Sequence, residues 1–450
     1  MRKASRPHLL DIAWPLFAEL GLGISVGVVA TIFAAHVSDQ AGGAFALANQ
    51  VAGMLFILFR IVGAGVSVVV AQSLGGGRKG TADTVSRAVL GASSWAGGLT
   101  ALMAFTGAYP LLRLMHAPAD VLAIAAPFLQ ALAPAMLLDA WNASMAAVMR
   151  AHLRVRETLV VIVIMHVCHL VLAFTLMPAY GLPGFAIALF ISRALGLILN
   201  LWLWRMRLQL VPHASDWWRL KMHELSAVVR IGLPGAAENF GYRLAFMVSV
   251  AVAGQLGTQA LATQAYTLQI TYGVLLFGLA TGLAVEIVVG HMTGAGHLRD
   301  AHKLVRRALA RGLAISVLAA TIAALAGRTL LHQFTQDEDI VSTGCRLLWW
   351  TVLLEPGRTF NLVVINALRA TGDARYPVIA GAASMAIVLG GGSWFLGIHL
   401  GLGLAGVWIA YAADEWIRGL LMWRRWVTLG WVPHARATHR RLMRHAGALH

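Results

Sequence analysis

The chain has 450 residues, of which 59% are hydrophobic and only 12% charged, and its mean hydropathy is +0.73. A composition so far from that of soluble globular domains indicates an integral membrane protein and argues against a soluble enzyme. The formal net charge of +16 does not indicate a nucleic-acid partner, because the basic residues fall in short loops between apolar segments and not on a water-soluble face.

The two cysteines, Cys168 and Cys345, lie in or beside apolar segments, and no CxxC motif or His/Cys cluster surrounds them. We therefore expect no disulfide framework, no metal site and no cofactor. The apolar run that follows the leader 1–8 is too long for the hydrophobic region of a signal peptide, and further apolar segments follow it. We interpret this run as the first membrane-spanning helix.

Twelve segments are long and apolar enough to cross a membrane, given that a helix needs about 20 residues to do so. In chain order they cover residues 9–36, 44–72, 86–112, 121–149, 158–178, 184–204, 227–254, 263–290, 309–331, 341–368, 377–397 and 402–422. The sequence therefore predicts an all-α integral membrane protein of twelve transmembrane helices.

The basic residues orient these predicted helices. When the loops are assigned alternately to the two sides, 27 of the 35 Lys and Arg residues fall on one side and three on the other, while five lie within the spans. Because basic loops stay in the cytoplasm, we expect both termini there. The expected location is a bacterial cytoplasmic (inner) membrane.

The chain contains an internal repeat. At a constant offset of 219, residues 12–77 align with 231–296 without a gap, and 16 of the aligned pairs are identical. This offset also aligns polar residues across the two copies: Glu19 with Glu238, Asn142 with Asn361, Arg150 with Arg369 and Arg156 with Arg375. After a slip of three, residues 181–188 match 403–410. Each copy thus contains six spans, and an even number gives parallel repeats.

The repeat predicts two six-helix lobes related by pseudo-two-fold symmetry. We assign residues 1–206 to an N-terminal lobe and 227–423 to a C-terminal lobe. Residues 207–226 form an interfacial linker on the cytoplasmic side, and 424–450 form a basic cytoplasmic tail. Two lobes around a midplane cavity suit transport by alternating access.

Ionisable side chains inside a membrane cost about 2.5 to 3.5 kcal/mol each or more, so they normally face the bundle interior and pair. Seven acids fall within the predicted spans: Glu19, Asp139, Glu238, Glu286, Glu355, Asp414 and Glu415. Five arginines accompany them: Arg60, Arg193, Arg243, Arg358 and Arg418. The excess of two acids favours protonation, and acids without an arginine partner are the candidate proton carriers.

Two ion pairs leave structural and functional interpretations open. Glu19 and Arg60 match in depth on consecutive antiparallel helices, either as a structural pair or as a coupling site. Glu355 and Arg358 are spaced i, i+3 around Pro356, which breaks the local hydrogen-bond ladder and opens carbonyls to a cavity.

Asp139 and Arg358 occupy equivalent positions in the two repeats with opposite charges, so they are candidates for a contact across the central cleft. Asp414 and Arg418, spaced i, i+4, are expected to form a local pair. Glu286 lies about one turn from its helix end, where its side chain is expected to snorkel.

Glu238 is the acid that we favour for binding an ion or a substrate. Asn239, Tyr242 and Arg243 lie within about a turn of it and form a polar face on an otherwise apolar helix. A site on this helix would place a titratable carboxylate near the midplane, where a coupling ion and a substrate both have to pass.

The coupling ion stays open between proton and sodium. A proton site needs only a titratable carboxylate, whereas sodium needs several converging oxygens, for which Asn142, Asn361 and Asn366 are candidates. His166 and His169 on the fifth predicted helix are interpreted as a helix-packing hydrogen bond, with a proton relay as the alternative.

Three stretches together resemble the multidrug and toxic compound extrusion (MATE) family. They are IAWP through ALANQ to AQSLGGGRKG, its echo from IGLP to VGHMTGAGHLRD, and LEPGRTFNLVVINALRATGDARYP. The resemblance covers essentially the whole chain and implies a V-shaped twelve-helix transporter that exports cationic or amphipathic compounds in exchange for protons or sodium. Many relatives carry an acid late in the first helix, where this chain reads Val29-Ala30-Thr31, so a mechanism through that acid does not transfer. Nor does Glu238 match the family's glutamate on helix seven in phase.

We expect a secondary active multidrug exporter and not an enzyme, because no catalytic or nucleotide-binding motif is present. Its expected partners are small cationic solutes and membrane lipids, and it is expected to act as a monomer. Glu19 and Glu238 are the expected lobe-equivalent carboxylates, and neutralising both should abolish export. The alternative function is a lipid-linked or polysaccharide flippase of a related fold, which would prefer a basic cavity.

Overall fold

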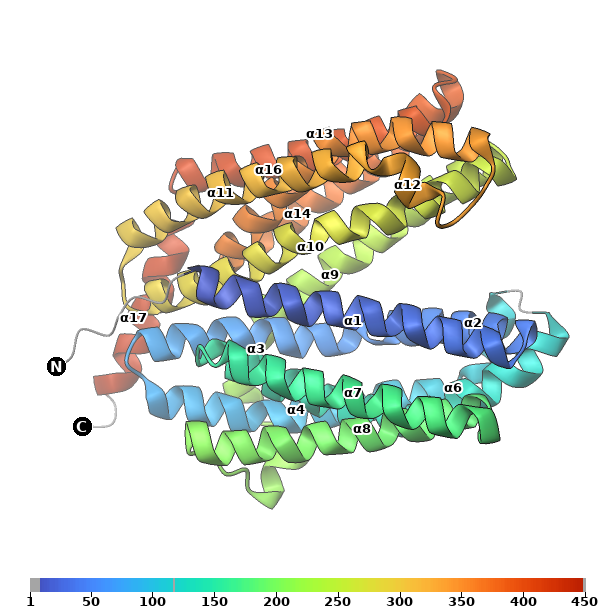
Figure 1. The fold of residues 1–450 in the computed structure, drawn as a ribbon. Coiled ribbons are helices and arrows are strands. Elements are labelled where there is room, and N and C mark those ends of the chain that lie inside the picture. Colours follow the sequence, from blue (N-terminus) through green and yellow to red (C-terminus); the bar gives the residue numbers. More distant parts are fainter. Residues whose placement is uncertain (1–8, 116–117, 448–450) are drawn as a thin grey trace. The chain divides into compact units, whose positions relative to one another are not determined.

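The computed structural model describes residues 9–115 and 118–447, which form helices joined by turns and short loops, with no strand among them (Figure 1). The first half contains α1 (Leu9–Val37), α2 (Asp39–Leu55), α3 (Ile57–Gly75), α4 (Lys79–Thr106), α5 (Ala108–Leu114), α6 (Ala119–Ala151), α7 (Val155–Tyr180), α8 (Leu182–Leu203), the π-helix η1 (Trp204–Leu208) and the 3-10 helix η2 (Ala214–Trp217). The two chain ends, to which the prediction of cytoplasmic termini applies, lie outside the described residues.

The second half repeats the pattern of long helices and adds a terminal one. It contains α9 (Met222–Gln255), α10 (Thr258–Gly294), α11 (Leu298–Leu325), α12 (Gly327–Leu331), α13 (Glu338–Ala370), α14 (Arg375–Ser384), the π-helix η3 (Met385–Gly391), α15 (Gly392–Trp394), the π-helix η4 (Phe395–His399), α16 (Gly403–Val427) and α17 (Val432–Gly447).

The chain divides into two compact units. The N-terminal unit comprises residues 18–74 and 78–236, and the C-terminal unit comprises residues 1–17, 75–77 and 237–450. In the N-terminal unit α6 packs against α2, α4 and α8, while in the C-terminal unit α13 packs against α10, α11 and α16. In both units, therefore, the helix at the centre of the packing carries a candidate asparagine: Asn142 on α6 and Asn361 on α13.

Among the described residues, eight helical segments are long and apolar enough to span a membrane by length and hydropathy. The long helices α9, α13 and α16 are not among them, because they carry the acids and arginines predicted inside the membrane, which lower their mean hydropathy. The span predicted at 44–72 is interrupted at Phe56 between α2 and α3, and the span predicted at 377–397 contains η3 and the first part of η4. Three consecutive glycines, 390–392, lie at the junction of η3 with α15, and glycine weakens the regular helical ladder there.

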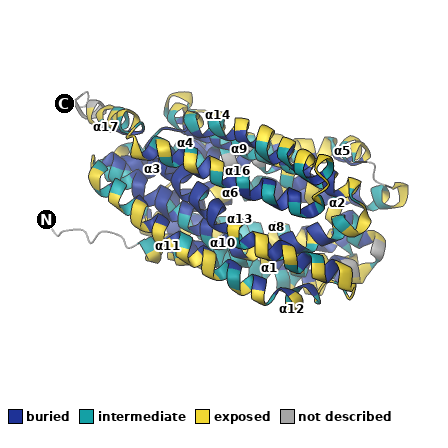
Figure 2. Ribbon diagram, turned by 90° about the horizontal axis from the view of Figure 1, so that it is seen from above, coloured by how far each residue is buried: buried dark blue, intermediate teal, exposed yellow. Residues whose placement is uncertain are grey.

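In the N-terminal unit, the backbones of α3 and α9 approach each other closely. A side chain at Gly65 of α3 would overlap the carbonyl of Val228 on α9, and one at Gly232 would overlap the carbonyl of Ile61. Only glycine fits at two such crossings, so these residues set the distance between α3 and α9. Large apolar side chains of the same unit are exposed, such as Phe174 at 69%, and exposed residues recur along the long helices (Figure 2). Exposed apolar side chains suit contact with lipid rather than water.

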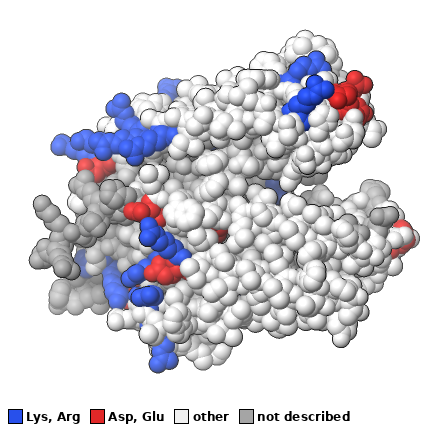
Figure 3. All heavy atoms as spheres, in the orientation of Figure 1, with Lys and Arg blue, Asp and Glu red and all other residues white. Residues whose placement is uncertain are grey.

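In the C-terminal unit, α17 packs against the end of α10. The Nδ1 atom of His439 lies 2.8 Å from the carbonyl oxygen of Gly294, and Trp431 stacks on Trp426 with ring centroids 4.3 Å apart. The basic tail predicted from Arg424 onward is therefore partly an ordered helix that is packed on the bundle. On the face shown in Figure 3, charged side chains gather at the ends of the helices and nearly all of the surface between them is uncharged.

Candidate functional site

The N-terminal unit contains a cavity of about 530 Å³. Most of its wall is apolar, and it is lined by Leu20, Gly23, Ile24, Phe56, Phe59, Ala143, Ala146, Val161, Ile162 and Met165. The polar residues of the wall are Glu19, Asp139, Asn142, Arg150, Thr158, His166, Arg193 and Asn200. Three predicted site residues, Glu19, Asp139 and Asn142, therefore line one cavity.

Two ion pairs lie in the wall of this cavity. Arg193 Nε on α8 lies 2.6 Å from Asp139 Oδ1 on α6, and Arg150 Nη1 at the end of α6 donates to Glu19 Oε1 on α1 at 2.8 Å. All four side chains are 13 to 21% exposed, so a solute in the cavity could reach them. The second carboxylate oxygen of Glu19, Oε2, is buried and accepts no hydrogen bond from the described residues.

An asparagine pair holds the two helices behind the Asp139–Arg193 ion pair. Asn142 Nδ2 donates to the backbone carbonyl of Arg193 at 2.9 Å, and Asn142 Oδ1 accepts from Asn200 Nδ2 at 2.9 Å. Because its amide is used in both directions, Asn142 positions α6 against α8 rather than offering a free oxygen to an ion.

The two histidines of α7 occupy different environments. His166 lines the cavity, whereas His169 is 3% exposed and packs edge-on against Phe185 with ring centroids 4.7 Å apart. Neither ring nitrogen of His169 has a hydrogen-bond partner among the described residues, so the packing hydrogen bond predicted for this residue is not formed.

Five buried charged residues of the C-terminal unit are linked by contacts with one another, and we call them the C-unit charge cluster: Glu355, Arg358, Asp414, Glu415 and Arg418. Arg358 Nη1 donates to Glu355 Oε1 at 2.8 Å, which confirms the predicted i, i+3 pair. Arg418 contacts Asp414 Oδ2 at 2.7 Å, which confirms the predicted i, i+4 pair, and Glu415 Oε1 at 2.9 Å. Arg358 Nε also donates to Glu415 Oε1 at 3.4 Å.

The two uncharged residues predicted for this unit border the C-unit charge cluster. Asn361 Nδ2 donates to Glu415 Oε2 at 3.0 Å, and the guanidinium carbon of Arg418 lies 5.6 Å from the ring centroid of Tyr242. Asn361 and Tyr242 therefore belong to the same polar region as Glu355 and Arg358.

Glu238, the acid that we favour for binding an ion or a substrate, has an arginine partner and so is not one of the unpaired acids. Arg369 Nη2 donates to Glu238 Oε2 at 2.5 Å, and these side chains are only 13% and 10% exposed. Glu19 likewise has an arginine partner, Arg150. The side chain of Arg60, the partner predicted for Glu19, lies outside the described part of the structure. The charge census placed Arg150 and Arg369 in cytoplasmic loops, but each lies in the last turn of a long helix and reaches back along it.

The two pairs formed by Glu19 and Glu238 are equivalent. The offset of 219 that aligns the two glutamates also aligns Arg150 with Arg369, so the duplication preserves a complete ion pair in each unit. Adding these two arginines to the five within the predicted spans makes seven, equal to the seven acids, and the predicted excess of two acids disappears.

The predicted contact between Asp139 and Arg358 is not needed to neutralise either residue, because each has an opposite charge in its own unit. The offset of 222 that matches 181–188 to 403–410 also aligns Arg193 with Glu415. Asp139–Arg193 and Arg358–Glu415 are therefore equivalent ion pairs in which the acid and the base have exchanged helices.

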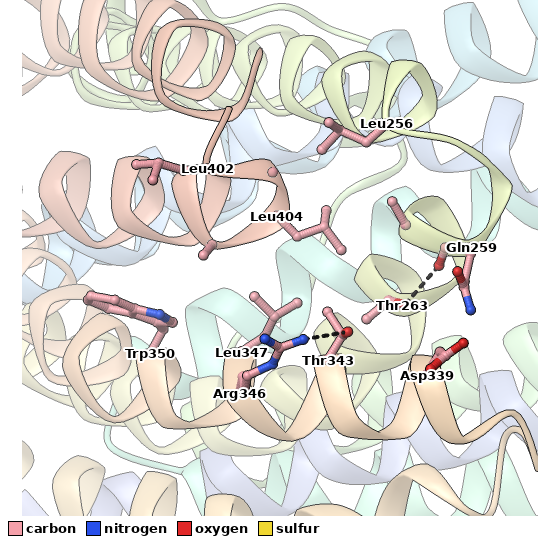
Figure 4. Close-up of a pocket in the computed structure, with 13 residues that line it drawn as sticks. Leu256, Gln259, Thr263, Asp339, Thr343, Arg346, Leu347, Trp350, Leu402 and Leu404 are labelled. Atoms are coloured by element: carbon pink, nitrogen blue, oxygen red, sulfur yellow. Dashed lines mark hydrogen bonds between the residues drawn. The ribbon is translucent and has the colours of Figure 1, made fainter. Parts of the chain in front are cut away.

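A second cavity, of about 410 Å³, lies in the C-terminal unit at the ends of α9, α10, α13 and α16 (Figure 4). Figure 4 shows Arg346 hydrogen-bonded to Thr343 within it, at 3.1 Å, and Asp339 on the same helix. None of the predicted site residues lines this cavity, so it does not form part of the candidate site.

Arg193 and Glu415 were predicted inside the membrane, but without a partner. Three further partners were absent from the predicted site: Arg150, Asn200 and Arg369. The repeat contained a signal for two of them, because Arg150 and Arg369 align at the same offset as Glu19 and Glu238. A pair of aligned acids together with a pair of aligned arginines indicates a duplicated ion pair.

Comparisons with known proteins agree with this architecture. The family model MatE matches residues 15–175 and 234–391. An uncharacterized transporter of Bacillus subtilis, YisQ, is 31% identical over 435 residues, which cover 95% of this chain and 96% of YisQ. A probable multidrug resistance protein NorM of Thermotoga maritima is 24% identical over 463 residues, covering 97% and 95% of the two chains.

Solved structures share the fold. The MATE transporter VcmN of Vibrio cholerae, in its bent form, superposes with a TM-score of 0.85 at 19% identity and covers 96% of this chain and 97% of its own. A transporter of the MOP superfamily from Pyrococcus furiosus superposes with a TM-score of 0.85 at 17% identity, with 96% of each chain covered. MATE structures have twelve helices in two lobes, as predicted here, and none of these names favours the flippase alternative. The chain is a multi-pass membrane transporter that belongs to the MatE family, the multidrug and toxic compound extrusion transporters.

Proposed function

We propose that this transporter exports cationic or amphipathic organic compounds in exchange for protons or sodium, by alternating access. The cavity of the N-terminal unit supports this proposal more than any other feature. Its volume of about 530 Å³ suits a small organic molecule, and its largely apolar wall favours amphipathic solutes. Asp139, which is 20% exposed, offers carboxylate oxygens to a cation from the wall of this cavity.

Dye transport by the purified full chain in liposomes tests this function. Accumulation of a rhodamine dye is expected when a proton or a sodium gradient is imposed separately, and no accumulation under either gradient would contradict the proposal. Asp139→Asn should weaken dye binding roughly tenfold, because it leaves Arg193 unpaired and repelling in the cavity.

A matched control separates the cavity from charge loss in general. Glu157→Gln removes an acid of the same unit that pairs with Arg154 outside the cavity, where the two side chains are 25% and 45% exposed. We expect this variant to bind and transport the dye like the wild type. Equal losses in Asp139→Asn and Glu157→Gln would remove the cavity from the mechanism.

We also propose that the protein lies as a monomer in a bacterial cytoplasmic membrane with both termini in the cytoplasm. The strong bias of Lys and Arg toward one set of loops supports this orientation. Cysteines introduced at Lys79 and at Thr335 of the chain lacking Cys168 and Cys345 should react with a membrane-impermeant maleimide from opposite sides, and labelling from one side only would contradict the orientation.

A further inference from the structure

The C-unit charge cluster holds one more acid than base. Glu355, Asp414 and Glu415 face only two guanidinium groups, those of Arg358 and Arg418, and all five side chains are less than one tenth exposed. The cluster would carry a net charge of −1 if every member were ionised. The neighbouring pair Glu238–Arg369 is neutral and does not correct this imbalance, and Arg243 is exposed.

The three acids differ in the hydrogen bonds that they accept. Asp414 accepts from the Ser384 hydroxyl at 2.6 Å and from Arg418 Nε at 2.9 Å. Both oxygens of Glu415 are used, because Oε2 accepts from Asn361 and Oε1 contacts both arginines. Glu355, in contrast, accepts from Arg358 alone, and no group of the described residues donates to its buried Oε2.

A buried carboxylate oxygen without a donor is the most expensive place for the surplus negative charge. We infer that Glu355 is the site that binds the coupling ion and that this ion is a proton, an inference that rests on the transport function proposed above. Sodium would need several free oxygens around it, whereas the other carboxylates of the cluster already accept hydrogen bonds and Arg358 lies directly beside Glu355.

Proton binding changes the partners of Arg358. One proton adds to a carboxylate oxygen of Glu355, no other bond is made or broken, and the neutral acid then attracts Arg358 less strongly. Glu415 on α16 remains as the ionised partner of Arg358, so the contact between α13 and α16 strengthens at the expense of the one within α13.

The titratable groups around this site lie on four helices. Arg358 shares α13 with Glu355, α16 contributes Asp414, Glu415 and Arg418, and the phenol groups near Arg358 are those of Tyr242 on α9 and Tyr272 on α10. Arg358 and Arg418 are already included in the charge count, so no further base of these groups neutralises Glu355.

Glu355→Gln tests the inference in the full chain reconstituted in liposomes, because glutamine resembles the protonated acid in shape and charge. We expect the variant to retain exchange of rhodamine across the membrane without a gradient. Accumulation driven by an imposed proton gradient, and the proton flux that accompanies it, should fall to the level of protein-free liposomes. The control Glu338→Gln changes an exposed acid at the start of α13, which pairs with Arg328 at 2.9 Å, and should leave both activities unchanged.

Infrared difference spectroscopy of the purified protein tests the proton directly and does not depend on transport or on one variant. A carbonyl band of a protonated carboxylic acid, shifted in D2O, is expected in the wild type and in Glu338→Gln but not in Glu355→Gln. Asp414→Asn should also lose this band, although Glu355 is intact, because it leaves two acids and two arginines in the cluster. The comparison of the wild type with Asp414→Asn remains available even if Glu355→Gln does not fold.

The outcomes separate the two proposals. Proton-driven accumulation by folded Glu355→Gln, accumulation by the wild type with sodium only, or a protonated band that survives in Asp414→Asn would each overturn the proton site and leave export intact. A wild type that moves no dye under either gradient would instead contradict export itself, while the infrared band would still report whether Glu355 is protonated.

Discussion

Replacing Arg369 by glutamine leaves the Glu238 carboxylate buried without its charged partner. Removal of one member of a buried ion pair destabilises a protein by 3 to 5 kcal/mol, and at 10 to 13% exposure we expect the lower end, about 3 kcal/mol. Arg150→Gln removes the equivalent partner of Glu19, which is more exposed at 18 to 21%, so a loss of about 1 to 2 kcal/mol is expected there.

The double variants distinguish a structural pair from a coupling site. Glu238→Gln/Arg369→Gln leaves two neutral amides that can hydrogen-bond each other, and it should recover most of the stability lost in the single variants. The coupling energy of the double-mutant cycle is expected to be about 1 to 3 kcal/mol. If Glu19 and Glu238 carried the coupling proton, neutralising them would abolish gradient-driven export whether or not their arginines were changed as well.

Two measurements decide between these alternatives. The midpoint of SDS-induced unfolding in mixed micelles, followed by tryptophan fluorescence, gives the order of stabilities. Dye accumulation in liposomes under a proton gradient shows whether the variant without all four charges, Glu19→Gln/Arg150→Gln/Glu238→Gln/Arg369→Gln, still exports. We expect it to do so. A stable quadruple variant that exchanges dye but no longer uses the gradient would refute a structural role for the two pairs.

Three further changes have defined outcomes. Gly65→Ala should lower stability by about 1 to 3 kcal/mol, because the added methyl overlaps the Val228 carbonyl, whereas Gly63→Ala on the same helix meets open space and should be neutral in the same unfolding assay. Burial raises the pKa of the Asp216 carboxyl, but hydrogen bonds from Lys221 and from the His213 backbone N–H outweigh it, so this pKa lies below its usual value. The ionised Asp216–Lys221 pair therefore stabilises the folded state at neutral pH, and this stabilisation is lost as the pH falls through the lowered pKa. Asp216→Asn should lower the free energy of unfolding by about 1 to 2 kcal/mol at pH 7 and should make stability depend less on pH in the acid range. Arg193→Gln should tighten binding of a cationic dye severalfold in a fluorescence titration, the opposite of Asp139→Asn, since it leaves Asp139 unpaired; weaker binding would show that the pair acts only through folding.

The number and order of the long helices could be predicted because length and hydropathy are local properties of the chain. The interruption at Phe56 was not predictable, since neither proline nor glycine occupies that position. The helix α17 was also missed, although Ala435 and Trp431 show that one side of it is buried. Its lack of acids favoured a solvated basic tail, and only its packing on Gly294 reveals an ordered helix.

The partners of the buried acids could not be assigned from helix depth. Counting basic residues by loop assigns Arg150 and Arg369 to the cytoplasmic side. An arginine side chain is long enough, however, to place its charge about one helical turn away from its backbone. Pairs within one helix, such as Glu355–Arg358, were predicted correctly because spacing alone brings them together. Pairs between helices, such as Asp139–Arg193, depend on which helices pack against each other, and this information is not local.

The duplication has preserved the positions of the ion pairs, but their polarity and their exposure differ between the two units. Asp139–Arg193 and Arg358–Glu415 join equivalent helices with reversed polarity, yet the first pair lines a cavity and is 13 to 20% exposed, whereas the second is 5 to 8% exposed. The N-terminal unit holds its two pairs as neutral, separate groups around space for a solute. The C-terminal unit surrounds Arg358 with two acids and adds a third, so that its interior holds a negative charge that only a bound cation or proton can remove. If solutes bind in the N-terminal cavity and the proton binds at Glu355, as proposed above, solute recognition and ion binding lie in different units, and a change in one charge pattern need not disturb the other.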